Sequence, residues 1–301
     1  MRVAFVTTID QDAIHDDVDL PFQIDAFAEA GIDLVHAPWE DESIAWDSFD
    51  LVVVRSPWNY VDRLDGFRMW LGARRGTEGF CNPAAVIEWN MDKRYLTDLA
   101  GHGVPIVPTA FVDSIEAFHE AAEKIDASEI VVKPSVSAGS RLTGRFGRTD
   151  AAAAALAETI LGGGLTVMVQ PFASLIDTEG EIGTVVFDGE RSHSFRKAAL
   201  LAEGGELVGG EYREEITAVI APDDVLDVVE AASRAATAIA RERGWVNPDE
   251  ELLYGRFDVV RLDDGTPALL EAELFEPCFF LPTDRRAANR FVDAVIRRIA
   301  D

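Results

Sequence analysis

The sequence has few cysteines and no long apolar stretch, and both absences narrow the class of protein. Its two cysteines, Cys81 and Cys278, form no disulfide framework and lack metal-ligand spacing. No segment approaches the roughly 18 apolar residues of a membrane span. The first residues, MRVAFVTTID, have no small-residue cleavage site, which predicts a first strand rather than a signal peptide. We therefore expect a cytoplasmic protein without a membrane partner, and its hydrophobic content of 48% supports a globular core.

Basic residues are scarce as well. The formal net charge is −27 with the acids spread along the chain, so a nucleic-acid partner is not expected. Only four residues are lysines, Lys93, Lys124, Lys133 and Lys197, against 23 arginines. A compact ammonium makes a point contact with phosphate where a guanidinium fork would not fit. Lysines in such a chain are therefore candidates for local functions, except Lys124, which lies in a charged helix.

Several widespread motifs are missing. The first βα segments lack G-x-G-x-x-G, so nothing indicates a dinucleotide site there. The Walker A pattern G-x-x-x-x-G-K-[ST] is absent throughout the sequence. No Ser-His-Asp or Cys-His arrangement is recognisable. Any nucleotide site in this chain therefore needs a different phosphate-binding loop.

The first third of the chain alternates strand and helix patterns. Apolar runs predict strands over 2–8, 32–39 and 49–56, with a helix over 20–31. This alternation predicts an α/β fold that begins with a small open parallel sheet over roughly residues 1–90. Ligands of such sheets bind beyond the carboxyl ends of strands, where RSPWNY follows the third strand. Arg55 is therefore a candidate for binding a substrate carboxylate, and the alternative is an ordinary proline-containing loop.

Patterns in the rest of the chain mix helices with strands. They predict a helix over 90–103, a helix capped by Asp113 with Glu116 three residues on, a strand over 129–135, a Gly/Ser-rich loop over 135–147, a helix from Asp150, a strand over 165–172, a hairpin over 181–198 that turns at Asp188-Gly189, and helices over 222–244 and 284–300.

A lysine at the end of one predicted strand is followed by small residues. Lys133 precedes a loop that contains Ser137, Gly139 and Ser140. Small residues allow backbone N–H groups to approach phosphate oxygens, and the lysine adds charge. The segment KPSVSAGS is therefore a candidate phosphate loop, and the alternative is an ordinary flexible loop.

The segment RFDVVRLDDGTPALLEAELFEP (256–277) places acids inside two apolar strands. Asp-Gly between alternating residues is a strong hairpin signal. A two-residue turn at Asp264-Gly265 would put Asp258 opposite Glu271 and Arg256 opposite Glu273. These four side chains would then share one face. The opposite, core face would consist of Phe257, Val259, Leu270, Ala272 and Leu274.

Carboxylates directly opposite each other are destabilising unless something compensates their charge. A divalent cation with oxygen ligands is the natural candidate, and magnesium combines one or two carboxylates with nucleotide phosphates. The alternative is a solvated polar face. A third feature, VQPF at 169–172, is a strand that ends where backbone groups could meet an adenine ring.

In this order the motifs resemble the ATP-grasp superfamily over nearly the whole chain. The resemblance is carried by NMDKR, VVKPSVSAGS, VQPF followed by EGEIG, and RFDVV…LLEAELFEP. It implies a Rossmann-like pre-ATP-grasp domain (1–90) and two ATP-grasp subdomains, a phosphate-binding lid (91–175) and a metal-binding, catalytic face (176–301). ATP would bind between the two subdomains.

The resemblance also implies roles for individual residues. Lys93 and Lys133 are similar to the two phosphate-binding lysines, and Lys197 is a further candidate. Gln170 and Phe172 resemble the adenine hinge, acting chiefly through backbone groups, and Glu181, or else Glu179, the ribose-binding acid. Asp258, Glu271 and Glu273 resemble the metal ligands, for one or two magnesium ions with manganese as an alternative. Arg256 resembles the arginine that stabilises the reacting group. The third metal ligand is often Asn in this superfamily, so Glu273 is a departure.

Within the superfamily, FVTTIDQDAIHDDVD, VVRSPWNY and WNMDKRYL resemble the branch that contains O-ureidoserine cyclo-ligase. The resemblance implies an ATP-dependent carboxylate–amine ligase that acts through an acyl phosphate on a small amino-acid-like substrate, with ring closure of O-ureidoserine to cycloserine as the specific reaction. It also suggests a homodimer. The alternatives are an intermolecular amino-acid or peptide ligase similar to glutathione synthetase, and an ATP-binding protein without turnover. Much of the substrate pocket is expected in the loops of the pre-ATP-grasp domain and in the segment 200–215.

Overall fold

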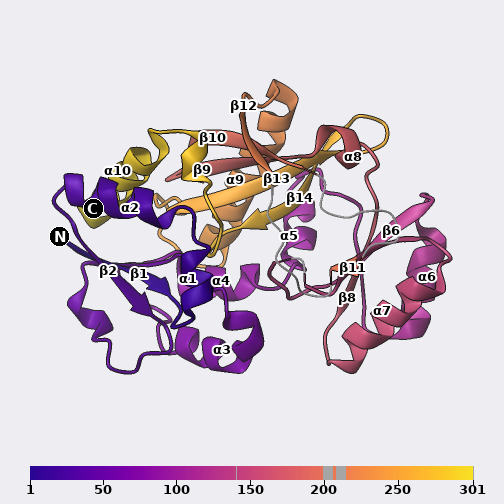
Figure 1. Ribbon diagram of the computed structural model, residues 1–301, viewed down its shortest axis with the longest axis horizontal. Helices are drawn as coiled ribbons and strands as arrows, with labels where there is room; N and C mark the ends of the chain where they lie inside the picture. The colour runs from indigo at the N-terminus through magenta and orange to yellow at the C-terminus, as the bar shows by residue number, and fades with distance from the viewer. Residues whose placement is uncertain (140, 199–205, 208–214, 301) are drawn as a thin grey trace.

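Three β-sheets form the framework of the protein, as a computed structural model shows for residues 1–139, 141–198, 206–207 and 215–300. Both termini lie at the same end of the molecule, beside the first sheet, and α6 and α7 lie at the other end (Figure 1). None of the helices in these ranges is long and apolar enough to cross a lipid bilayer.

The first sheet is parallel and covered on both faces. Its strands lie in the order β2 (Asp33–Pro38), β1 (Arg2–Thr7), β3 (Leu51–Val54) and β4 (Phe80–Cys81). Val3 and Phe5 of β1 pack with α2 (Leu20–Glu29) and α10 (Ala287–Ala300), whereas Ala4 and Val6 pack with α3 (Leu64–Gly72) and α4 (Ala84–Asn90). A strand with helices on both faces needs apolar residues at every position, which explains its continuous apolar run. The predicted parallel sheet is confirmed.

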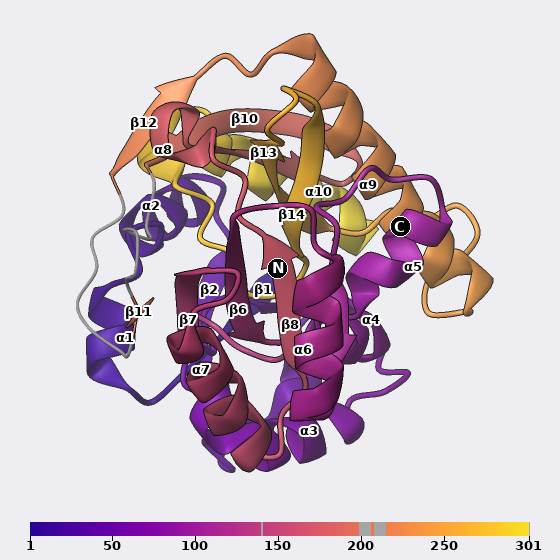
Figure 2. The same ribbon diagram turned by 90° about the vertical axis from the view of Figure 1, so that its right-hand side faces the viewer.

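The second sheet is antiparallel and has helices on one side. Its order is β11 (Glu206–Leu207), β7 (Thr143–Gly147), β6 (Glu129–Pro134), β8 (Val167–Pro171) and β5 (Ala110–Val112). Figure 2 shows α6 (Ile115–Lys124) and α7 (Ala151–Gly162) in front of it. The helix predicted from Asp150 is confirmed as α7, and the Asp150 side chain caps it by accepting from the Ala152 N–H.

Two predictions for this region are wrong. Ser114 rather than Asp113 caps α6, because its hydroxyl accepts from the Ala117 N–H while Asp113 accepts from Thr166. The end of the predicted loop 135–147 forms β7, which pairs with β6 and completes its hydrogen bonding on one side.

The third sheet carries the acids predicted for the metal and ribose sites, together with Arg256 and Lys197. Its antiparallel order is β12 (Ile216–Val219), β10 (Glu190–Lys197), β9 (Glu181–Phe187), β13 (Tyr254–Arg261) and β14 (Pro267–Glu273). The predicted turn at Asp188-Gly189 connects β9 to β10. Helix α9 (Asp223–Glu242) packs on one face, against Phe257, Val259 and Ala272. The opposite face of β13 and β14 is therefore the polar one.

The remaining helices are short. They are α1 (Gln11–His15), α5 (Tyr95–Gly101) and α8 (Ile176–Glu179). The helix predicted over 90–103 is interrupted: α4 ends at Asn90 and α5 begins at Tyr95, so Lys93 lies in the connection between two helices rather than inside one.

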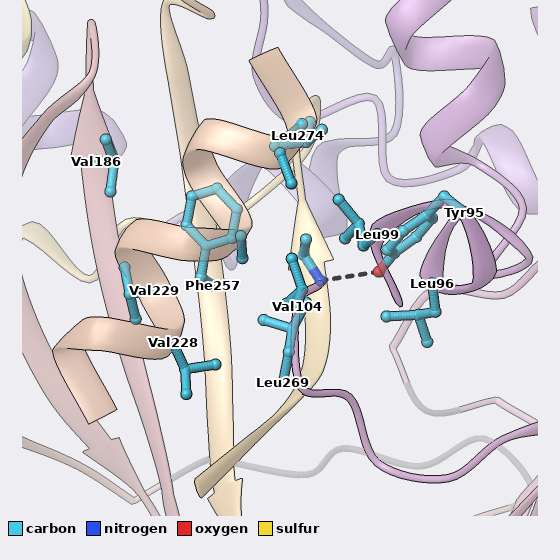
Figure 3. Close-up of a cluster of buried hydrophobic side chains, with 14 of the residues drawn as sticks. Tyr95, Leu96, Leu99, Val104, Val186, Val228, Val229, Phe257, Leu269 and Leu274 are labelled. Carbon is cyan, nitrogen blue, oxygen red and sulfur yellow. Dashed lines mark hydrogen bonds between the residues drawn. The ribbon is translucent and has the colours of Figure 1, made fainter. Parts of the chain in front are cut away.

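Side chains of this interrupted helix cover the free edge of β14. Asn90 Nδ2 donates to the Ala272 carbonyl at 2.8 Å, and Asn90 Oδ1 accepts from the Leu274 N–H at 2.8 Å. The Tyr95 hydroxyl accepts from the Ala272 N–H at 2.8 Å (Figure 3). These bonds fix the backbone between Glu271 and Glu273, and both glutamates consequently point to the polar face.

Replacing Asn90 with Ala is expected to lower the free energy of unfolding by about 2–4 kcal/mol, because it leaves one buried N–H and one buried carbonyl of β14 without partners. Urea unfolding would measure the change. Asn247→Ala is the matched control, since Asn247 is exposed and bonds only within its own turn. Equal effects of the two substitutions would contradict the role of Asn90 in hydrogen-bonding the edge of β14.

Candidate active site

A cavity of about 510 Å³ lies where the second sheet, the third sheet and the loop after β3 meet. This volume is in the range of small-molecule and cofactor sites. Its walls come from the second sheet, from the polar face of the third sheet and from the loop after β3. The lining includes Lys93, Lys133, Ser137, Gly139, Gln170, Phe172, Glu181, Lys197, Arg256, Glu271 and Glu273. Most of the predicted site residues therefore lie around one cavity.

The hairpin β13–β14 presents its acids as predicted, but through a different turn. Arg256 pairs with Glu273 and Asp258 with Glu271. The turn contains three residues, Asp263 to Gly265, since the Leu262 N–H donates to the Thr266 carbonyl at 2.9 Å. The predicted two-residue turn is therefore wrong.

An irregularity between the turn and the acids restores the expected register. Asp258 faces Glu271 whereas Val259 faces Leu269, so Leu270 is the extra residue of a β-bulge. Leu269 is fully buried in the core, and Leu270 lines the cavity instead. The assignment of Leu270 to the core face is wrong for this reason.

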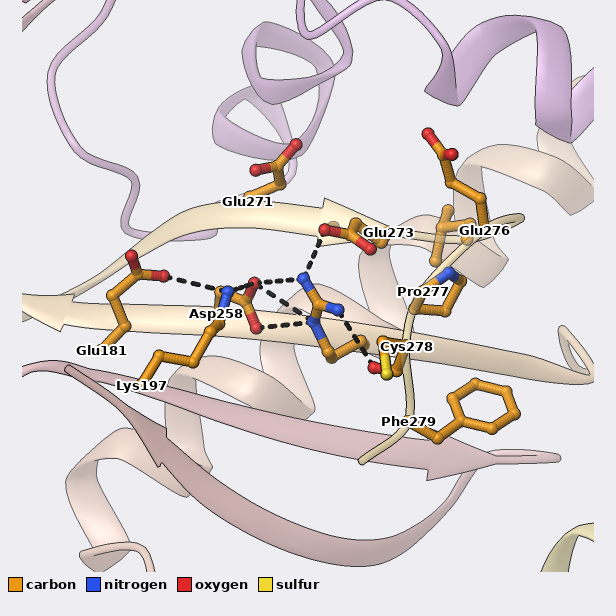
Figure 4. Close-up of polar contacts among 12 residues, drawn as sticks. Glu181, Lys197, Asp258, Glu271, Glu273, Glu276, Pro277, Cys278 and Phe279 are labelled. Carbon is orange, nitrogen blue, oxygen red and sulfur yellow. Dashed lines mark hydrogen bonds and ion pairs between the residues drawn. The ribbon is translucent and has the colours of Figure 1, made fainter. Parts of the chain in front are cut away.

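Asp258 is the most enclosed of the acids and contacts two cations. Lys197 Nζ lies 2.8 Å from Asp258 Oδ2, and the Arg256 guanidinium donates to both carboxylate oxygens at 2.9–3.2 Å (Figure 4). Gly183 of β9 lies opposite Asp258, and a Cβ there would come within 2.9 Å of Asp258 Oδ1. Burial opposes ionisation of Asp258, but Arg256 and Lys197 outweigh it and lower its pKa to about 2.

Glu271 and Glu273 are more open, at 26% and 23% side-chain exposure, and each contacts one cation. Lys93 Nζ lies 3.0 Å from Glu271 Oε1, and Arg256 donates to Glu273. Burial raises the pKa of Glu273 to about 7, against Arg256 and together with Glu271. Burial also opposes ionisation of Glu271, but Lys93 and Lys133 lower its pKa overall. Near neutral pH Glu271 is therefore ionised, whereas Glu273 is only partly ionised.

The lysines differ in how they are held. Lys93 donates to the Ser137 carbonyl at 3.0 Å, which connects it to the candidate phosphate loop. Lys197 also reaches Glu181 Oε2 at 3.3 Å. Lys133 Nζ has no hydrogen-bond or ion-pair partner among the residues that the structure describes, and burial lowers its pKa. Ser140 lies outside the described residues.

The candidate adenine and ribose residues line the same cavity. The Gln170 side chain donates to Thr109 at 2.8 Å, and the Phe172 N–H donates to the Glu129 carbonyl at 3.0 Å. The Phe172 N–H is therefore not available to adenine, so the hinge would need other backbone groups, whereas the Gln170 amide keeps a second N–H and its oxygen. Glu181 lies in the cavity wall, whereas Glu179 is exposed and pairs with Arg261.

Arg55 lies outside this cavity. It is 2% exposed and does not line the cavity. Its Nη1 donates to the Pro277 carbonyl at 3.1 Å, its Nη2 lies 3.7 Å from Asp19, and its guanidinium lies 3.6 Å from the centre of the Phe279 ring. These contacts hold the segment after β14 in place. The geometry does not support direct binding of a substrate carboxylate by Arg55.

The loop after β3 does reach the cavity, through residues that the sequence analysis did not select. Trp58 and Tyr60 line the wall together with Glu276. The Tyr60 hydroxyl donates to Glu276 Oε1 at 2.6 Å, and Trp58 Nε1 donates to the Glu276 carbonyl at 3.0 Å. The position of RSPWNY beyond a parallel strand was the signal for this wall. Most of the segment 200–215, expected to form the substrate pocket, lies outside the described residues.

The carboxylates of β13 and β14 could bind magnesium only if another ligand supplied the remaining oxygens of its coordination shell. Among the residues described, no three His, Cys, Asp or Glu side chains are grouped as a metal site. Magnesium needs only one or two protein carboxylates when phosphates and water complete its shell. Glu271 and Glu273 fit this requirement, whereas both oxygens of Asp258 are engaged by Arg256 and Lys197.

Comparison with known proteins gives close relatives. Residues 3–80 match the family model for the N-terminal domain of the D-cycloserine synthetase DcsG. The cycloserine biosynthesis protein DcsG of Streptomyces lavendulae is 34% identical over 291 residues, which cover 94% of each chain.

Solved structures agree. The crystal structure of D-cycloserine synthetase DcsG is 32% identical, covers 99% of this chain and 100% of its own, and superimposes with a TM-score of 0.88. A D-alanine–D-alanine ligase from Bacillus anthracis complexed with ATP shares the fold, with a TM-score of 0.64 at 15% identity and coverage of 100% of this chain and 97% of the ligase. The ATP-grasp fold expected from the motifs is confirmed. The chain belongs to the D-cycloserine synthetase family of ATP-grasp enzymes, and it is an ATP-dependent ligase that forms C–N bonds.

Proposed function

We propose that the enzyme closes O-ureidoserine to cycloserine, with ATP activating the substrate carboxylate. The main support is the match to DcsG along 94% of both chains. The cavity supports it too, because it combines the cations and carboxylates that phosphoryl transfer needs with room for a small second substrate.

In this proposal ATP lies between the second and third sheets. Residues 91–175 act as the phosphate-binding lid and 176–301 as the catalytic face, with 1–90 contributing one wall of the substrate end. Lys93 and Lys133 contact the phosphates, and Lys133 is suited to this because its ammonium has no partner within the described residues. The backbone of Ser137 and Gly139 faces the same phosphates. Glu181 binds the ribose hydroxyls.

Glu271 and Glu273 would hold magnesium, with Asp258 behind them. The bound metal would neutralise charge on the ATP phosphates and thereby favour phosphoryl transfer. Arg256 is held between Asp258 and Glu273, so its guanidinium has a fixed position from which it stabilises charge on the reacting carbonyl. Lys197 maintains the ionised state of Asp258.

The proposed reaction consists of two transfers and one hydrolysis. A carboxylate oxygen attacks the γ-phosphorus, the bond to ADP breaks, and an acyl phosphate forms. The nitrogen attached to the side-chain oxygen then attacks the acyl carbon, loses its proton, and phosphate leaves with the electron pair. Because cycloserine lacks the carbamoyl group of O-ureidoserine, that group must also be released, and with one water it yields carbon dioxide and ammonia.

The test is ADP release with magnesium and ATP over a panel of amino acids that includes D- and L-O-ureidoserine, with mass spectrometry of the products. We expect cycloserine, ADP, phosphate and ammonia in equal amounts from one enantiomer. Turnover only when two substrates are supplied would replace ring closure by an intermolecular ligation.

A further inference from the structure

The wall formed by Trp58, Tyr60 and Glu276 contains a polar atom without a partner. Glu276 Oε1 accepts from Tyr60, but Glu276 Oε2 is buried and has no hydrogen-bond partner among the described residues. Leaving a buried carboxylate oxygen unpaired is costly, so such atoms in a cavity wall commonly face a ligand. This unpaired acceptor belongs to a residue that lines the cavity, in the wall that the proposed function assigns to the substrate.

The surroundings of Glu276 favour a cationic ligand group over a neutral one. Burial raises the pKa of Glu276 well above its usual value, Tyr60 opposes this, and Glu273 adds to it. Asp16 lines the same cavity, and Lys93, which opposes the raised pKa of Glu276, already pairs with Glu271. Figure 4 shows Glu276 beyond Glu271 and Glu273 along the chain, on the side away from Glu181 and Lys197. Without a ligand the raised pKa favours the protonated carboxyl, and a cation beside it would lower that pKa and stabilise the carboxylate, which a neutral amide would not do.

We propose that Glu276 Oε2 accepts a hydrogen bond from the α-ammonium group of an amino-acid substrate and so selects substrates that carry this group. The assignment rests on the proposed amino-acid-like substrate. Trp58 holds the Glu276 backbone by donating to its carbonyl, and Tyr60 holds the carboxylate by donating to Oε1. The α-ammonium is the one cationic group of O-ureidoserine. Its binding to Glu276 would also orient the neighbouring substrate carboxylate toward ATP.

The test compares wild type with Glu276→Gln, on O-ureidoserine and on its analogue without the α-amino group. Gln is close in shape and keeps an oxygen for the Tyr60 hydroxyl, so the fold is expected to persist, which thermal unfolding would check. We expect KM for O-ureidoserine to rise roughly 10- to 100-fold, as for a lost hydrogen bond between charged groups. KM for ATP should stay within about twofold, and the variant should lose most of its preference for the amine-bearing substrate over the analogue.

The outcomes separate this assignment from the proposed function. Wild-type turnover of O-ureidoserine with an unchanged KM in Glu276→Gln would overturn the assignment and leave the function standing. An equal KM rise for both compounds would also overturn it, because the residue would then only shape the wall. Absence of wild-type turnover with every amino acid in the panel would overturn the proposed function and this assignment together.

Discussion

Glu271→Gln is expected to abolish turnover, a loss of at least about 10³-fold in kcat, while the protein remains folded. Gln keeps the shape of the side chain but removes the charge that the metal and Lys93 require. Glu271 is partly open to solvent, so leaving Lys93 without its ion pair should lower the free energy of unfolding by only about 1–2 kcal/mol. ADP release and urea unfolding would measure the two effects separately.

Glu179→Gln is the matched control for this substitution. Glu179 is exposed and pairs with Arg261 outside the cavity. Its replacement should leave kcat and KM for ATP unchanged within about twofold, as expected for an exposed ion pair. Full activity of Glu271→Gln would refute the proposed role of Glu271 in metal binding. Impaired ATP binding in Glu179→Gln would indicate that Glu179, rather than Glu181, binds the ribose.

The hairpin shows why the sequence predicted which side chains share the polar face but not the turn and the bulge between them. Alternation over 256–260 and 271–274 fixed which residues share a face, because side chains in strands repeat with period two. The turn type and the bulge at Leu270 each shift the register by one residue, and the two shifts cancel. Neither leaves a clear pattern in a sequence where Leu269 and Leu270 are equally apolar.

Arg55 and Glu276 show a different limit. The position beyond β3 correctly indicated a wall of the cavity, but a sequence does not show which side chains of a loop turn inward. The partners of Arg55, Asp19 and Pro277, are distant in the sequence, and so is Tyr60 from Glu276. Contacts between separate sheets of this kind depend on the packing of the whole molecule. Local patterns therefore predicted the sheets and the acids on β13 and β14, but not these pairs.

Asp258→Asn is expected to impair both stability and turnover, in contrast to Glu271→Gln. Asp258 is 1% exposed, and its neutralisation would leave two buried cations, Arg256 and Lys197, short of a counter-ion. Removing one partner from a buried ion pair costs about 3–5 kcal/mol. Urea unfolding at pH 7 should show a loss of this size, with Asp227→Asn, on the exposed face of α9, as a control with little effect.

The pH dependence of this loss follows from the shifted pKa. The pKa of Asp258 is about 2 in the folded protein, below its ordinary value of 3.8, so folding favours the ionised form. Its contribution to stability is therefore fully present above pH 3.8 and disappears as the pH falls toward 2, which corresponds to about 2 kcal/mol. The difference in unfolding free energy between wild type and Asp258→Asn should shrink by that amount between pH 5 and about pH 2. A difference that stays constant over this range would mean that Asp258 is not held ionised by Arg256 and Lys197, and the fixed position assigned to Arg256 would lose its basis.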